Sequence, residues 1–244
     1  GQMRDQVGLE LEAGVVGTEV HAHGTESCPT AVAGVDGVPD GWVVARVESG
    51  RVRWHVVPDA TAVLAVTTGC AAVGVDIPLR TPTGHRPREC DVATAKALGR
   101  ARSSVFPAPP REVLDAPDYA AACAIARRLT GRAISVQAWN ITPKIREWVG
   151  RDLPTHVVEA HPELALRRLA PETEFASKKT ARGAGQRIAA LARWLDVATA
   201  LGDLPPGPRM DDALDALAVA WSAARWARGE AEVLGGGPEG FVVV

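Results

Sequence analysis

With 244 residues and a formal net charge of −2, the chain is long enough for one large core but lacks the overall positive charge that attracts nucleic acid. No apolar run is long enough to span a bilayer, and the first residues include acids and glycines where a signal peptide has a basic and then an apolar stretch. The four cysteines form no C-x-x-C pair, which argues against a disulfide framework and a structural zinc site. We therefore expect a cytoplasmic protein without membrane association.

The first predicted elements are three short strands and a helix. Residues 1–30 show no sustained periodicity and predict a flexible extension, so the fold is expected to begin at residue 31. Three β-branched runs joined by tight turns predict an antiparallel meander, and the helix and strand that follow predict a β-β-β-α-β core with a crossover. The ranges are 31–36, 41–48 and 52–57 for the meander, 60–68 for the helix capped by Asp59, and 71–76 for the fourth strand.

The second half of the sequence is mainly helical. Prolines, arginines and alanine-rich segments from about residue 80 to 152 predict a helical insertion, with helices at 91–99 and 119–129. A strand at 155–159 and helices at 162–169, 184–201 and 210–229 complete the chain. This is an α/β arrangement with a mixed sheet, flanked by helices, that resembles RNase H-like folds and occupies residues 31–244.

Acidic residues lie where the predicted strands end and the last helix begins. Asp36, Asp76 and Glu159 each close a short apolar strand, and Asp212 and Asp215 lie on the last helix beside its apolar face. Carboxylates gathered at one sheet edge repel one another unless they share a cation. The sequence therefore predicts an Mg²⁺ or Mn²⁺ site with the four aspartates as ligands and Glu159 as a further ligand or water-orienting residue.

Each acid also has a structural interpretation. Asp36 precedes a glycine and suits a turn, Asp76 can simply end a strand, and Asp211 or Asp212 suits the N-terminus of a helix. Asp215 lies on the second helical turn, too far along the helix to cap its N-terminus. A structural ion-pair network is therefore the main alternative to a metal site.

Basic residues near the acids predict phosphate contacts. Lys144 lies in PKIREW, and Lys178, Lys179 and Arg182 lie in SKKTARGAGQR. Such clusters contact phosphate oxygens in nucleic-acid complexes, although charge runs also occur as solvated faces. His161, two residues after Glu159, suits a general acid or a hydrogen-bonded structural residue.

The chain resembles a known family in motifs that cover residues 32 to 240. They read, in order, GVDGVPDGW, VGVDIPL, RECDVATAKALG, SSVFPAPPREVL, QAWNITPKIREW, VVEAHPELAL, SKKTARGAGQR and DDALDALAVAWSAAR. This set is similar to domain-of-unknown-function family 429, which is described as predicted nucleases of RNase H-like fold. The residues that match the family's motifs are Asp36, Asp76, Glu159, Asp211, Asp212 and Asp215, with Lys144, Lys178 and Lys179.

These observations together lead us to expect a metal-dependent nuclease that hydrolyses phosphodiester bonds of nucleic acid, DNA or RNA. Two alternatives stay open. One is a nucleotide-binding phosphotransferase or ATPase of related fold, and the other is a non-catalytic module that binds nucleic acid or protein. The sequence also leaves the oligomeric state open, a homodimer included.

Overall fold

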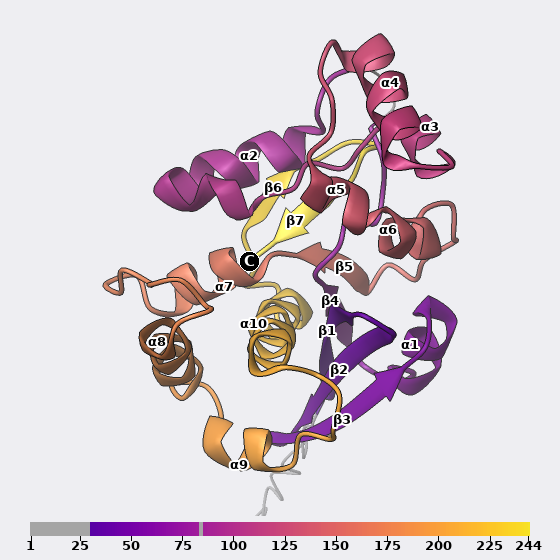
Figure 1. Ribbon diagram of the computed structural model, residues 1–244. Coiled ribbons are helices and arrows are strands. Elements are labelled where there is room, and N and C mark those ends of the chain that lie inside the picture. The colour runs from indigo at the N-terminus through magenta and orange to yellow at the C-terminus, as the bar shows by residue number, and fades with distance from the viewer. Residues whose placement is uncertain (1–29, 83–84) are drawn as a thin grey trace, which may run out of the picture.

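The computed structural model describes residues 30–82 and 85–244, so nearly all of the expected extension lies outside the described residues. A mixed sheet forms the centre of this described part, with the strand order β3-β2-β1-β4-β5-β7-β6 (Figure 1). The strands are β1 (Val32–Val38), β2 (Gly41–Glu48), β3 (Arg51–Val57), β4 (Ala72–Val75), β5 (Val157–Ala160), β6 (Val233–Gly235) and β7 (Phe241–Val243). The expected α/β fold with an antiparallel meander and parallel strands is confirmed.

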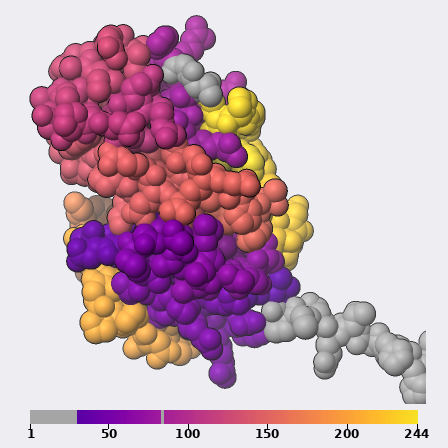
Figure 2. All heavy atoms as spheres, turned by 90° about the vertical axis from the view of Figure 1, so that its right-hand side faces the viewer, coloured from indigo at the N-terminus to yellow at the C-terminus, as the bar shows by residue number. Residues whose placement is uncertain are grey.

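Helices cover both faces of the sheet and extend beyond one end of it. They are α1 (Ala60–Val66), α2 (Glu89–Leu98), α3 (Arg111–Leu114), α4 (Tyr119–Thr130), α5 (Val136–Asn140), α6 (Thr142–Trp148), α7 (Pro162–Leu169), α8 (Ala181–Leu191), α9 (Val197–Gly202), α10 (Met210–Ala227) and the 3₁₀ helix η1 (Gly99–Ser104). In Figure 2, α3 and α4 lie at one end of the molecule and the β1–β3 meander lies toward the other. Among the described residues, no helix combines the length and apolar character needed to cross a bilayer.

The parallel strands fix which side chains share a face. In the register, Val35 of β1 pairs with Val75 of β4, and Val75 pairs with Glu159 of β5. Asp36 and Asp76 each follow one residue after this row, so they lie on the face opposite to Glu159 because side chains alternate along a strand. The two aspartates therefore share the sheet face that α10 covers, and Glu159 belongs to the other face.

Helix α10 packs unusually close to the sheet. A Cβ atom on Gly34 of β1 would lie 1.9 Å from the carbonyl oxygen of Ala216, and one on Gly74 of β4 would lie 2.4 Å from that of Val219. The predicted apolar face of the helix is confirmed, since Leu214 and Leu217 are almost fully buried. Small residues at the crossing let the two backbones approach, which brings the start of α10 to the ends of β1 and β4.

Two sequence expectations about the second half are incomplete or wrong. The single helix expected over 184–201 is two helices, α8 and α9. Helix α8 ends at Leu191, and α9 begins after Asp196, whose carboxylate accepts a hydrogen bond from the Thr199 N–H at 3.1 Å and caps the second helix. Strands β6 and β7 were not expected, since three residues are too few to show a period.

Replacement of Gly34 by alanine tests the close approach of α10. Gly34→Ala is expected to lower the free energy of unfolding by about 3 kcal/mol, because the added methyl group collides with backbone atoms that cannot rotate away. Gly185→Ala is the matched control, since it lies within α8 with open space around its Cβ position. It is expected to stabilise by about 0.5 to 1 kcal/mol. Urea denaturation measures both, and equal effects would contradict the packing argument.

Candidate functional site

A cleft of about 980 Å³ lies at the ends of β1, β4 and β5 and beside the start of α10. Helices α5 to α8 and the η1 segment contribute its walls. Most of the residues predicted from the sequence line this cleft: Asp36, Asp76, Glu159, Asp212, Asp215, Lys144, Lys178 and Lys179. Arg182 does not line it and is exposed on α8.

Asp36, Asp76 and Asp215 form the acidic centre of the cleft. Burial raises the pKa of Asp36 well above its usual range, and repulsion from Asp76 and Asp215 raises it further. The pKa of Asp76 is also raised well above its usual range, by burial and then by repulsion from Asp215. Burial raises the pKa of Asp215 to about 6 although the Lys178 ammonium opposes this shift. The fold thus brings together three carboxylates that repel one another.

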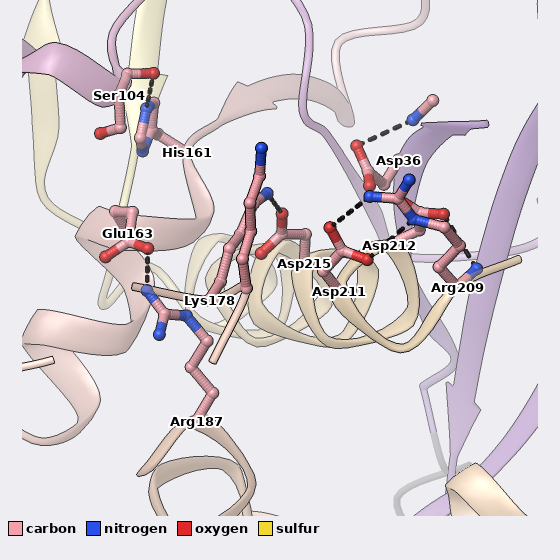
Figure 3. Close-up of polar contacts among 12 residues, drawn as sticks. Asp36, Ser104, His161, Glu163, Lys178, Arg187, Arg209, Asp211, Asp212 and Asp215 are labelled. Carbon is pink, nitrogen blue, oxygen red and sulfur yellow. Dashed lines mark hydrogen bonds and ion pairs between the residues drawn. The ribbon is translucent and has the colours of Figure 1, made fainter. Parts of the chain in front are cut away.

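These three carboxylates have few partners of their own. Asp36 accepts a hydrogen bond from the N–H of Gly37 at 2.8 Å, and Asp215 forms an ion pair with Lys178 (Figure 3). Asp76 makes no side-chain hydrogen bond or ion pair with any residue that the structure describes. Among the described residues, the Lys178 ammonium is therefore the one side-chain cation paired with this group of acids, and Asp76 has no hydrogen-bonded partner for its carboxylate.

The two acids at the start of α10, Asp211 and Asp212, bind different groups of Arg209 (Figure 3). Asp212 accepts a hydrogen bond from the backbone N–H of Arg209 at 2.9 Å, which fixes the first turn of the helix. Asp211 instead pairs with the Arg209 guanidinium at 3.1 Å. Asp212 lines the cleft and Asp211 does not, so only Asp212 extends the acidic centre.

Glu159 is committed to a buried ion pair. Its carboxylate accepts hydrogen bonds from both terminal nitrogens of Arg88, at 2.8 and 2.7 Å, and from the N–H of Leu79 at 3.0 Å. Arg88 is fully buried and also holds Asp91 at 2.5 Å. Glu159 lies on the opposite sheet face from Asp36 and Asp76, because side chains alternate along a strand, and it is paired there with Arg88.

The spacing of possible ligand atoms differs between the two acidic groups. Within the described ranges, one group of three has its ligand atoms within 4.8 Å of one another, and it is Cys90, Asp91 and Glu159. Arg88 already supplies this group with a cation, and burial raises the pKa of the Cys90 thiol to about 12. The cleft aspartates are more widely spaced, so a cation between them would need water or substrate oxygens to complete its shell.

The predicted basic residues differ in their availability. The Lys144 ammonium donates to the carbonyl of Gly41 at 2.7 Å and lies 3.7 Å from Glu147, which holds it against β2. Lys178 is paired with Asp215. Lys179 forms no ion pair with the described residues, and neither does Arg167, which also lines the cleft. Lys179 and Arg167 are therefore the cations best placed to meet an anion.

His161 lies on the cleft wall but points to the backbone of the η1 segment (Figure 3). Its Nε2 lies 3.4 Å from the carbonyl oxygen of Ser104, and burial lowers the pKa of the imidazole. Next to it, Glu163 is paired with Arg187. The neutral ring and its backbone contact favour the hydrogen-bonded structural role for His161 over that of a general acid.

The sequence analysis did not predict the buried pairing of Arg88 with Glu159 or the position of Arg167 in the cleft. Arg88 left one signal, its position three residues before Asp91 at the start of a helix, where such pairs meet. Arg167 left no such signal, because arginines in the last turn of an amphipathic helix, as Arg167 and Arg168 are, are normally surface residues.

Removal of Arg88 tests the buried ion pair. Arg88→Met is expected to lower the free energy of unfolding by about 3 to 5 kcal/mol, since Glu159 and Asp91 would remain buried without a cation. Adding Glu159→Gln and Asp91→Asn to the same chain is expected to recover part of this loss. Arg100→Met, at an exposed position in η1, is the control. A loss no larger than that of the control, measured by urea denaturation, would show that the pair contributes nothing.

The raised pKa of Asp76 predicts a pH dependence of stability. The folded state holds this proton at pH values where the unfolded state has released it, so ionisation destabilises the fold as pH rises above about 4. Asp76→Asn removes that penalty. In a chelator, the variant is therefore expected to gain stability relative to the wild type between pH 4 and neutrality.

Asp203→Asn, at an exposed position after α9, is the control for this experiment and is expected to show no such trend. Thermal denaturation across the pH range measures both variants. A difference between Asp76→Asn and the wild type that stays constant with pH would contradict the burial of an uncompensated charge.

Comparison with known proteins gives one match. A family described as "Protein of unknown function (DUF429)" matches residues 34–240, a range that includes every acid of the cleft. No curated protein and no solved structure matches the chain.

Proposed function

We propose that this chain, which belongs to the DUF429 family of proteins of unknown function, is a divalent-metal-dependent phosphodiesterase that acts on nucleic acid. The observation that carries the proposal is the meeting of Asp36, Asp76 and Asp215 in one cleft, where Lys178 is the one described cation that forms an ion pair with any of them. Three carboxylates at the ends of neighbouring elements are costly to bury together unless a cation of higher charge is shared.

The donor set suits a hard cation. Asp36, Asp76 and Asp215 would hold Mg²⁺ or Mn²⁺ through carboxylate oxygens, and Asp212 lies beside them at the start of α10. When bound, such an ion polarises a phosphate oxygen and activates water. The wide spacing of the aspartates favours an ion that keeps several waters, as Mg²⁺ does. Glu159 is not a ligand in this proposal, since Arg88 binds both of its oxygens.

The other residues that line the cleft support nucleic acid as the substrate. Lys179 and Arg167 offer positive charge without an ion pair among the described residues, which suits phosphate groups. Phe106 lines the same cleft with 38% of its surface exposed, and an exposed aromatic ring there can stack on a base. The cleft volume is at the upper end of the range for small-molecule sites and suits part of a strand.

A nuclease assay tests this function. Purified protein is incubated with Mg²⁺ or Mn²⁺ and with labelled DNA and RNA in single-stranded, duplex and branched forms. We expect metal-dependent cleavage that a chelator abolishes and that Asp76→Asn reduces at least about 100-fold. Asp203→Asn is the matched control, since it removes an exposed carboxylate outside the cleft.

Two outcomes would contradict the proposal. One is the absence of cutting with either metal on every substrate, and the other is unchanged cutting by Asp76→Asn. Stabilisation by ATP in a thermal shift assay, without any cutting, would instead favour a phosphotransferase.

A further inference from the structure

Lys178 places a positive charge inside the acidic centre of the cleft. Its ammonium pairs with the carboxylate of Asp215, which is only 5% exposed, whereas the Lys178 side chain is 41% exposed. Figure 3 shows the lysine reaching from its loop to α10. The same ammonium also attracts the carboxylates of Asp36 and Asp76. Lys178 thus places its charge directly beside Asp215 and close enough to attract Asp36 and Asp76, the residues that would hold a metal ion.

Hydrogen bonds and close packing anchor the backbone of the loop that carries Lys178. The carbonyl of Ser177 accepts a hydrogen bond from the Thr180 hydroxyl at 2.8 Å, and that of Ala176 accepts one from Arg187 at 2.8 Å. Gly183 packs so closely that a Cβ atom there would lie 2.1 Å from the Ser177 carbonyl oxygen. The ammonium of a lysine on an anchored loop can move only as far as its flexible four-carbon side chain allows.

Space for a second position of the ammonium lies next to the cleft. A smaller hollow of about 390 Å³ shares Lys178 and Lys179 with the main cleft and is lined also by Thr180, Arg209 and Asp211. The long flexible stem of lysine allows its charged end to turn toward this open side. Leaving Asp215 would therefore not require the loop to unfold.

A divalent ion and the ammonium compete for the same carboxylate. Both are attracted by Asp215, and two cations held within a few ångströms of each other repel. An ammonium carries one charge, whereas Mg²⁺ or Mn²⁺ carries two and binds several carboxylates at once. The metal therefore gains more from the three aspartates than the lysine does.

We propose that Lys178 is a built-in cation that stabilises the metal-free acidic centre by pairing with Asp215 and that a divalent metal ion displaces it. The metal site itself rests on the proposed function, but the competition does not depend on which substrate is cut. The chain would then fold without metal because the lysine partly neutralises the acids, at the cost of weaker metal binding.

Calorimetric titration of chelator-treated protein with Mn²⁺ tests the competition. Lys178→Met is expected to bind Mn²⁺ on the order of tenfold more tightly than the wild type, because the competing charge is gone. Lys178→Arg keeps the charge and is expected to bind no more tightly than the wild type. Lys96→Met removes an exposed lysine of α2 outside the cleft and is expected to leave the affinity unchanged.

A second measurement does not require the methionine variant to fold. In wild-type protein with ¹⁵N-labelled lysine, the ammonium signal of Lys178, assigned by its absence from Lys178→Arg, is expected to shift when Mg²⁺ is added. An unchanged signal in protein that binds the metal would overturn the displacement.

The outcomes separate this inference from the proposed function. Equal Mn²⁺ affinities of wild type and Lys178→Met would overturn the competition and leave the nuclease proposal standing. Tighter binding by Lys178→Met without cleavage of any substrate would support the competition and remove the nuclease proposal. A lack of Mn²⁺ binding by both proteins would overturn both.

Discussion

The close crossing of α10 over β1 and β4 is the constraint on which the rest of the site depends. The helix approaches so near that Gly34 and Gly74 have no room for a side chain. At this distance, Asp215 on its second turn comes to the carboxylates of Asp36 and Asp76 instead of facing solvent. The packing of small residues in the core therefore sets where the acids of α10 lie in the cleft, because both belong to one continuous, rigid helix.

Strand alternation then divides the acids at the sheet edge into two groups with different surroundings. Asp36 and Asp76 share the face of α10, where the cations are few. Glu159 is in register with Val75, one residue before Asp76, so its side chain lies on the other face. There Arg88 binds both of its carboxylate oxygens and links it to Asp91. Carboxylates that lie close along the edge therefore differ in their partners: Glu159 is paired with a buried arginine, and Asp36 and Asp76 form no ion pair among the described residues.

The sequence predicts those parts of the fold that depend on local pattern. The meander, the fourth strand and the apolar face of α10 follow from alternation and from helical period, and Asp59 caps α1 as expected. The gathering of the aspartates followed from topology, since parallel strands end at one edge. The break between α8 and α9 was not predicted; the second helix begins after Asp196, whose carboxylate accepts hydrogen bonds from the backbone and the hydroxyl of Thr199.

Pairings across the chain could not be predicted in the same way. Arg88 and Glu159 are 71 residues apart, and Lys178 and Asp215 are 37 apart. Which acid meets a cation depends on a single step of strand register and on the anchoring of one loop, and neither changes the sequence pattern. The loop backbone before α8 is held by hydrogen bonds while the Lys178 side chain stays half exposed, so the acidic centre has a cation that is attached to the chain. Under the proposed function, this cation would compensate the acids in the metal-free protein and would give way to a ligand of higher charge.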